Sequence, residues 1–390
     1  MIGKLGEYLK PTPESEKPMP DVSTSSTQRF IPGLELSRRF YLELVRPLLD
    51  EHFPGLAHAA ALIGYGSEVL GFDTAMSMDH AWCPRVLLFL REEDAALAEP
   101  IKAMLGRRLP REFLGFPLDT VPVEGEPGVF WMKPGGEGPV DHKGVPVTLR
   151  AFIQETLDWD MAQPLTPVDW LSLSSQLLAT ITAGAVHFDS VGELTALRAQ
   201  LAWYPRDVWL YLLACGWARI AQEEHLMPRA GFVGDELGSA LIASRLARDV
   251  MALCFLMEKR YAPYPKWFGS AFQKLACAPH MSPHLERAQA AQTWQEREAA
   301  LSEAYVLLAQ MHNALGLTDP LPEQVGSFHG RPFKVIDAEA FSRAIQAKID
   351  DPQVRRIADK GLIGSIDQFS DNTDLRSHVG WRAGVCRLYE

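Results

Sequence analysis

The chain has 390 residues, of which 38 are basic and 49 acidic, so its formal net charge is −11 at pH 7. A hydrophobic content of 47% excludes global disorder, and the length allows a sizeable core without disulfides or metals. The acidic balance argues against non-specific nucleic-acid binding, which needs clustered Lys and Arg, although a local basic groove stays compatible with it.

Residues 11–28 are rich in Pro, Ser and Thr, which predicts a flexible leader over residues 1–29 without a core of its own. The first residues lack the apolar segment of a signal peptide, so we expect a cytoplasmic protein. Leu36, Phe40, Leu44 and Leu48 then recur at four-residue steps, which predicts one stripe of a helix.

Short apolar runs dominate the next part of the chain. Residues 58–67 and 85–90 predict two buried strands, residues 92–106 a helix, and residues 107–143 a segment rich in loops. Residues 145–153 predict a third strand, because Val, Thr and aromatic side chains suit a pleated surface. The first part of the chain is therefore expected to mix α and β structure.

From Thr166 onward the pattern becomes helical. The uncharged run at residues 170–186 carries Ser, Thr and Gln, so it predicts a buried helix rather than a membrane span. The five cysteines stand far apart and form no CxxC motif, which fits a reducing compartment. Helices are expected over residues 167–185, 190–202, 205–224, 235–259, 293–315, 338–349 and 352–359.

The stretch that indicates function is GSEVLGFDTAMSMDHAW, residues 66–82. An apolar strand runs into Gly66 and Ser67, and eleven residues separate Ser67 from Asp79. Backbone N–H groups exposed after a tight glycine turn can bind triphosphate oxygens, and a Ser hydroxyl adds a donor. The pattern resembles the nucleotidyltransferase superfamily of DNA polymerase beta, whose motif is Gly-Ser, a short spacer and Asp-x-Asp.

Further blocks resemble an uncharacterised bacterial family with a nucleotidyltransferase-like domain followed by a helical domain. The blocks are PGLELSRRFY, LAWYPRDVWLYLL, VGDELGSALIASRLARDVM, RYAPYPKWF and GSIDQF. The plan is similar to that of aminoglycoside nucleotidyltransferases, whose helical domain helps to form the acceptor site. The resemblance implies an α+β protein with a nucleotidyltransferase-like domain over residues 30–165, a helical domain over 166–316 and a C-terminal segment over 317–390.

The implied activity is the Mg²⁺- or Mn²⁺-dependent transfer of a nucleoside monophosphate from a nucleoside triphosphate, with ATP as the expected nucleotide, to a hydroxyl group. The acceptor stays open between a small molecule, a tRNA and a protein, no membrane is expected, and the oligomeric state is open. Two carboxylates of Asp-x-Asp on a strand would share one face and could hold two metal ions. The residues expected in the site are Gly66 and Ser67 on phosphates, Asp79 on metal, Arg85 and Lys266 on the nucleotide, and Glu236 as general base.

One position departs from the family pattern. Where the family reads Asp-His-Asp-Trp-Gly-Pro-Arg, this chain has Ala81 at the second carboxylate. Ala81 indicates either an engineered substitution or a natural pseudoenzyme, and both readings predict weak metal binding and impaired catalysis. The expected later strand carries no third carboxylate, and Asp141 lies upstream of it.

Several residues have ordinary structural explanations beside the functional ones. Asp73 and Ser77 are expected to form turns, and His80 to pack. Tyr264 and Trp267 could stack on a base, but we expect them to pack in the core.

Arg245, Arg248 and Asp249 interrupt an apolar helix, which favours an internal ion pair over a ligand contact.

Two other functions remain open. The chain could be a non-catalytic, regulatory nucleotide-binding protein, which would bind nucleotide without turnover even after Ala81→Asp. Alternatively, Arg219 and His225 match an Arg-x5-His spacing that resembles helical ribonucleases. Glu223 and Glu224 lie between them and would repel phosphate.

Overall fold

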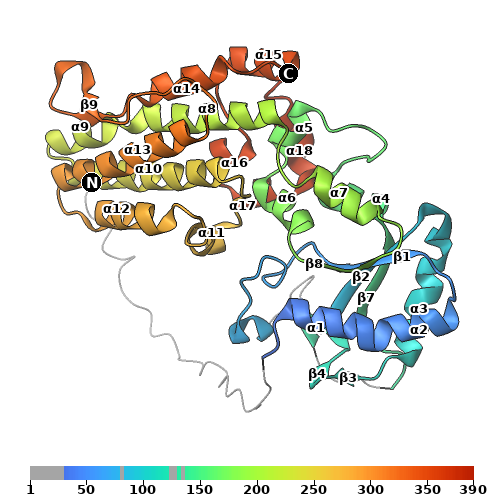
Figure 1. The fold of residues 1–390 in the computed structure, drawn as a ribbon. Coiled ribbons are helices and arrows are strands. Elements are labelled where there is room, and N and C mark those ends of the chain that lie inside the picture. The colour runs from blue at the N-terminus through green and yellow to red at the C-terminus, as the bar shows by residue number, and fades with distance from the viewer. Residues whose placement is uncertain (1–29, 80–82, 123–129, 133–136) are drawn as a thin grey trace, which may run out of the picture. The chain divides into compact units, whose positions relative to one another are not determined.

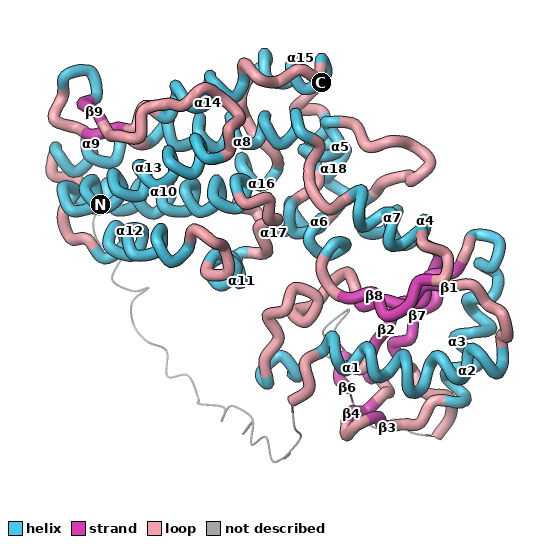
Figure 2. The backbone as a smooth tube through the Cα atoms, viewed as in Figure 1, coloured by secondary structure: helices cyan, strands magenta, loops and turns pink. Residues whose placement is uncertain are grey.

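A four-stranded mixed sheet forms the first part of the chain. The computed structural model describes residues 30–79, 83–122, 130–132 and 137–390. The strand order is β7-β2-β1-β8, shown in magenta in Figure 2. β1 pairs antiparallel with β2 and β8, whereas β2 and β7 run parallel. The strands are β1 (His58–Leu62), β2 (Arg85–Leu90), β7 (Lys143–Thr148) and β8 (Ala185–Asp189).

The helical segment before the sheet contains a π turn. It consists of α1 (Gly33–Phe40), the π turn η1 (Tyr41–Val45) and α2 (Arg46–His52). A π turn takes up one extra residue. The buried positions therefore shift from the expected Leu44 and Leu48 to Val45 and Leu49, while Leu36 and Phe40 are buried as expected.

Short elements connect the first three strands. They are η2 (Ala75–Asp79), η3 (Glu92–Leu97), α3 (Ala98–Arg108), β3 (Glu112–Phe113), β4 (Phe116–Pro117), β5 (Thr120–Pro122) and β6 (Phe130–Met132). The expected helix after β2 is confirmed, with Ile101 and Leu105 buried. The segment expected to be rich in loops contains two small hairpins, β3–β4 and β5–β6.

The third strand is shorter than the sequence predicts. The strand expected over residues 145–153 ends at Thr148, and α4 (Leu149–Leu157) follows directly. The Thr148 hydroxyl accepts a hydrogen bond from the Ala151 N–H at 3.2 Å. Thr is favourable both in strands and as a helix N-cap, so it can end the one and begin the other.

The prediction of a single helix over residues 167–185 is wrong. The structure has α5 (Pro167–Ser172) and α6 (Ser175–Thr182), then β8 at the edge of the sheet. Thr166 and Ser174 each cap the N-terminus of a new helix. Because β8 belongs to the sheet, the sheet region extends beyond residue 165, where the first domain is expected to end.

The rest of the described chain is mostly helical (Figure 1). Its elements are α7 (Glu193–Gln200), α8 (Arg206–Glu223), α9 (Leu226–Phe232), α10 (Glu236–Met257), α11 (Pro265–Phe272), α12 (Ala278–Ala290), α13 (Trp294–Ala314), β9 (Gly326–Ser327), η4 (Phe328–Gly330), β10 (Lys334–Val335), α14 (Ala338–Gln346), α15 (Pro352–Lys360), α16 (Ile366–Phe369), α17 (Thr373–Ser377), η5 (Val379–Trp381) and α18 (Arg382–Cys386).

The long helices form the core of this part. α10 packs against α8 and α13, and α14 packs on α8. The predicted start of α13 is confirmed, because Thr293 and Glu296 form a capping box. The α+β class is thus confirmed, with a mixed sheet followed by a helical part.

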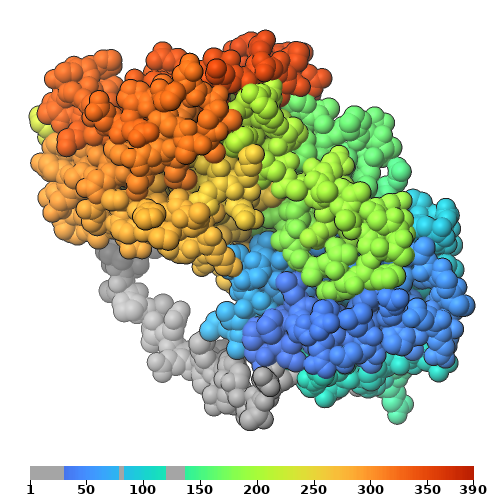
Figure 3. All heavy atoms as spheres, viewed as in Figure 1, coloured from blue at the N-terminus to red at the C-terminus, as the bar shows by residue number. Residues whose placement is uncertain are grey.

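Residues 32–390 form one compact unit. Figure 3 shows residues near 190, in green, against the blue residues of the sheet region, where β8 pairs with β1. No helix within the described residues has both the length and the apolar character that a membrane crossing requires.

Candidate functional site

A glycine turn follows β1, as the sequence predicts. Gly64 has φ +92° and Gly66 has φ +123°, a conformation that favours glycine. The Gly64 N–H donates to the Thr180 carbonyl at 2.9 Å, which ties the turn to α6. The Ser67 carbonyl accepts from the Phe72 N–H at 2.9 Å, while the Ser67 hydroxyl has no partner among the described residues. That hydroxyl is free to donate to a ligand.

A buried ion pair holds this turn in place. The guanidinium of Arg85, at the start of β2, lies 2.6 Å from the Glu68 carboxylate, and both side chains are more than nine-tenths buried. Arg85 also donates to the Tyr65 carbonyl and covers the Tyr65 ring at 4.3 Å. A Cβ at Gly66 would overlap the Arg85 guanidinium. Glu68 balances the charge of Arg85, so the structure shows a structural role for Arg85, while its expected phosphate contact stays a prediction.

A pocket of about 670 Å³ opens beside the turn. Its walls come from the end of β1, from Gly64 and Tyr65 of the turn, and from β2, β7, α4, α6 and residues 377–380. Gly66 and Ser67 are not among its lining residues. Its charged lining consists of Arg85, Lys143 and Glu155, and the remaining walls are mostly apolar, with Val145 and Phe152 among them. A volume of this size can hold a nucleotide-sized ligand.

The metal-binding part of the motif is incomplete. Asp79 ends η2 rather than lying on a strand, so the expected alternation of carboxylates along a strand does not apply to it. The Asp79 side chain and residues 80–82, with His80 and Ala81, lie outside the described part. Within the described part, no three His, Cys, Asp or Glu side chains come together to hold a metal ion.

The third carboxylate is not supplied by the sheet either. β7 has the sequence KGVPVT, without an acidic residue. Asp141 precedes β7, and its N–H donates to the Asp119 carboxylate at 2.7 Å. Asp119 is buried and pairs with Arg111 at 2.6 Å. The carboxyl groups of the described residues therefore do not make a Mg²⁺ site.

The loop after Ser67 packs against the helical part, where blue and yellow-orange residues meet in Figure 3. Phe72 stacks on Trp267 of α11, with ring centroids 5.9 Å apart and planes 8° apart. The Lys274 ammonium lies 3.9 Å from the Phe72 centroid and donates to the Gly71 carbonyl at 3.3 Å. Lys266 is exposed beside Trp267, so the structure brings it near the loop that follows Ser67.

Of the two predicted turn formers, Ser77 is confirmed, whereas the Asp73 carboxylate contacts a residue forty positions away. The Asp73 carboxylate accepts from the Gly33 N–H at 2.7 Å, at the start of α1. The Ser77 hydroxyl accepts from the Thr74 N–H at 3.0 Å. Trp267 packs against Phe72, as expected for a packed aromatic residue.

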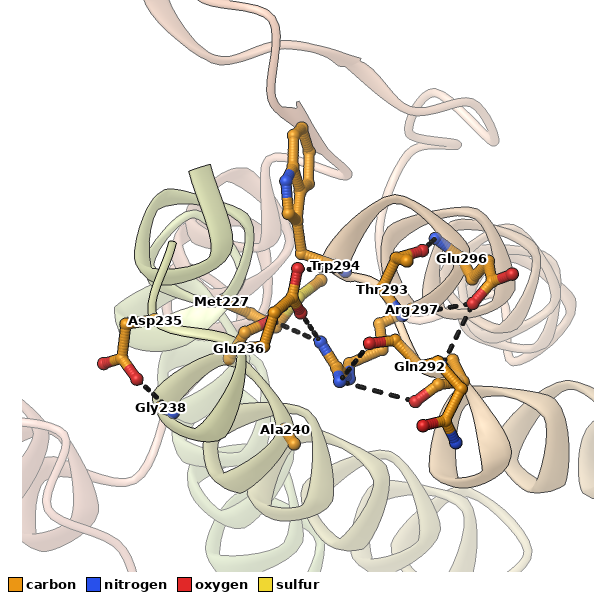
Figure 4. A network of polar contacts seen from close by, with 12 residues as sticks. Met227, Asp235, Glu236, Gly238, Ala240, Gln292, Thr293, Trp294, Glu296 and Arg297 are labelled. Carbon is orange, nitrogen blue, oxygen red and sulfur yellow. Dashed lines mark hydrogen bonds and ion pairs between the residues drawn. The ribbon is translucent and has the colours of Figure 1, made fainter. Parts of the chain in front are cut away.

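Glu236 has structural partners in place of the expected catalytic role. Its carboxylate pairs with Arg297 of α13 at 2.5 Å and accepts from the Trp294 N–H at 3.3 Å (Figure 4). Arg297 is buried and also donates to the Ser239 hydroxyl at 3.1 Å. Glu236 thus joins the first turns of α10 and α13, and it lines neither the pocket beside the turn nor the loop after Ser67.

The ribonuclease pair is not brought together. Arg219 pairs with Asp249 at 3.4 Å, whereas His225 stacks on Phe328 with centroids 4.4 Å apart. Burial lowers the pKa of His225, with Arg229 adding to the effect, and Arg219 is not among the groups that act on it.

The charges inside α10 form ion pairs, of which only that of Asp249 is internal as expected, whereas the Arg245 side chain is exposed and the Arg248 side chain is partly exposed. Arg245 pairs with Glu223, Arg248 with Asp371, and Asp249 with Arg219. Burial raises the pKa of Asp249 to about 6 despite these cations.

Comparison with known proteins gives one family match. Residues 170–268, from α5 to α11, match a family described as a domain of unknown function, DUF4037. The match agrees with the expectation of an uncharacterised family. No curated protein matches the chain.

Among solved structures, the chain is similar to a nucleotidyltransferase-like protein from Exiguobacterium sibiricum 255-15. The two share 11% identity over 76% of this chain and 82% of the other, with a TM-score of 0.29.

Sequence reasoning missed Glu68 and Lys274. Glu68 stands beside Ser67, but nothing local indicates that it is buried against Arg85 from the next strand. Lys274 is about two hundred residues from Gly71 in the chain, so its position depends on the fold.

Proposed function

We propose that the turn at residues 64–67 binds the phosphates of a nucleoside triphosphate and that the adjoining pocket takes the nucleoside. Two observations support this proposal: the Ser67 hydroxyl at the end of the glycine turn is unengaged, and Gly64 and Tyr65 at the start of the turn line a pocket of about 670 Å³. Backbone N–H groups and a hydroxyl at such a turn suit phosphate oxygens. ATP is the first nucleotide to test.

The chemistry proposed for this site is nucleotidyl transfer to a hydroxyl acceptor. Mg²⁺ or Mn²⁺ would neutralise the triphosphate in that reaction. The residues that the structure describes do not supply a metal site, position 81 is Ala and β7 has no acid. We therefore assign to this chain the binding and orientation of the nucleotide. Transfer is expected to be impaired until a second carboxylate is restored.

The first experiment measures thermal unfolding and nucleotide affinity with each nucleoside triphosphate, with and without Mg²⁺. A nucleotide at 100 times its dissociation constant should add about 2.7 kcal/mol of stability. Ser67→Ala should weaken binding about tenfold, because a hydrogen bond to a charged group is lost. Ser244→Ala, the same change at an exposed position on α10, should bind as the parent does.

Two outcomes separate transfer from regulation. Ala81→Asp should gain metal-dependent stabilisation and release of pyrophosphate if the site is a nucleotidyltransferase centre. Binding without turnover in Ala81→Asp would favour the alternative, a non-catalytic nucleotide-binding protein, which the missing carboxylates also fit. Binding of no nucleotide by either form would rule out both.

A further inference from the structure

A second pocket, of about 660 Å³, lies on the helical side of the loop after Ser67. Leu70 and Phe72 form one wall, and residues from α6, α7, the segment after α10, and α11 with the residues that follow it form the rest. Four cationic residues line the pocket, and among its described lining residues there is no Asp or Glu. The four are Arg198, Lys259, Arg260 and Lys274.

None of these cations has a carboxylate partner among the described residues. Arg198 donates to the carbonyls of residues 181–183 at the end of α6, at 2.8 to 3.2 Å. The Lys259 ammonium lies 4.3 Å from the centroid of the Trp209 ring. Lys274 donates to the Gly71 carbonyl. These partners leave the positive charges uncompensated.

Arg260 is the least engaged of the four. It is exposed, and its side chain has neither an ion pair nor a hydrogen bond within the described chain. Arg260 and Tyr261 also line a neighbouring pocket of about 270 Å³ that contains Trp203 and Tyr204. The Arg260 guanidinium is thus available to a ligand between aromatic walls.

Nearby negative charge is too small to balance these cations. The C-termini of α6 and α10 each contribute about half a negative charge. Glu258 adds one, but its two oxygens already accept from the Ala276 and Cys277 N–H groups at 2.7 Å. The four cations carry four positive charges, and the two helix ends and Glu258 together supply about two negative charges, so a net charge of about +2 remains. The whole chain is strongly acidic, so this local excess stands out.

We propose that this pocket binds the phosphate group of a small phosphate-bearing molecule. A doubly charged phosphate matches the remaining charge, and Arg and Lys are the residues that recognise it. The aromatic side chains of Phe72 and Tyr261 would cover the organic part of such a ligand. If the chain is the proposed transferase, this molecule would be its acceptor, so the acceptor role rests on the proposed function. Phosphate binding in this pocket does not depend on that function.

The test uses inorganic phosphate as the probe, at constant ionic strength balanced with chloride. We measure thermal unfolding and ³¹P line broadening for the full chain. Phosphate should stabilise the parent. Arg260→Gln with Lys274→Gln should weaken phosphate binding by about tenfold or more, since two charged donors are lost.

Two matched variants make the result specific. Lys348→Gln with Lys360→Gln removes two exposed lysines elsewhere and should bind phosphate as the parent does. Lys274→Arg keeps the charge and should retain binding, which separates loss of the ligand site from a folding defect. Equal weakening in both double variants would overturn the proposal, because the effect would then follow net charge.

The two sites can fail separately. Ser67→Ala should leave this phosphate effect intact, since its hydroxyl belongs to the turn. Loss of the phosphate effect in Ser67→Ala, with retention in Arg260→Gln/Lys274→Gln, would assign phosphate to the turn and overturn the second site. Failure of nucleoside triphosphates to bind, with the phosphate effect intact, would remove the proposed function alone.

Discussion

The turn after β1 depends on two charged residues that water barely reaches. Arg85 and Glu68 are almost fully buried and 2.6 Å apart, so each neutralises the other in a region of low dielectric. Removing one partner of a buried pair leaves an uncompensated charge and typically costs 3–5 kcal/mol, whereas replacing both by apolar groups costs far less. The pair therefore helps to keep the shape of the turn.

A double-mutant cycle tests this role. Arg85→Met and Glu68→Met should each lower the free energy of unfolding by about 3–5 kcal/mol, and the double variant should lose clearly less than the sum. Urea unfolding measures all four proteins. Arg38→Met and Glu35→Met, in an exposed pair at 2.8 Å, should each change stability by about 1 kcal/mol at most. An Arg85→Met variant as stable as the parent but unable to bind nucleotide would restore the phosphate role.

At the scale of elements, the joint between α6 and β8 is as constrained as the turn after β1. Gly184 has φ +71°, and its N–H donates to the Val69 carbonyl at 2.8 Å. A Cβ at this position would overlap the Leu62 carbonyl oxygen. β8 can pair with β1 because the chain turns here without a side chain.

Gly184→Ala should destabilise the protein strongly. The positive φ costs roughly 1 kcal/mol for Ala, and the overlap with a backbone oxygen adds a further loss of about 2 kcal/mol or more. Gly192→Ala is the matched control, since Gly192 has φ +83° with nothing within 4 Å of the added methyl. The loss of unfolding free energy in Gly192→Ala should reflect the positive φ alone. Equal losses in urea unfolding would show that the joint tolerates the methyl group.

Elements with a long period or a strong cap could be predicted from sequence. α8, α10 and α13 match the predicted ranges closely, and Thr293 marks the start of α13. β8 was missed because a five-residue strand after an apolar helix has no period of its own. The π turn was missed because its extra residue changes the register without changing composition.

In the candidate site, too, local features could be predicted from sequence and long-range contacts could not. Gly66 and Ser67 could be found because a glycine turn is a local feature. The partners of Arg85 and Glu236 could not, since Glu68 and Arg297 meet them through strand pairing and helix packing. A charged residue in an apolar segment indicates that an ion-pair partner exists, but the sequence does not show which residue that partner is.

For the whole molecule, buried titratable groups set the pH dependence of stability. Burial raises the pKa of Glu224 to about 7, partly offset by the N–H groups of Ala338 and Ile336. A carboxyl pKa raised by folding stabilises below its unfolded value and loses that contribution as pH rises through the folded value. Burial lowers the pKa values of His187 and His312 to about 4, so their contribution is lost as pH falls from about 6.5 to 4. The opposing trends favour a stability maximum in mildly acidic solution.

Glu224→Gln should remove one of these trends. Between pH 5 and pH 8 the parent should lose about 3 kcal/mol through Glu224, and the variant should not. Urea unfolding across this range measures the difference, in which the histidine contributions cancel. The exposed Glu339→Gln should follow the parent curve. Parallel curves for Glu224→Gln and the parent would contradict the burial effect.

The position of β8 also bears on synthesis and on excised fragments. β1 is complete at residue 62, but the strand that covers its second edge emerges from the ribosome more than a hundred residues later. Until then β1 presents unpaired N–H and C=O groups, which other chains can pair with. A fragment cut at residue 165 would keep that edge bare permanently and would tend to aggregate, whereas one extended past Asp189 would carry its own edge strand.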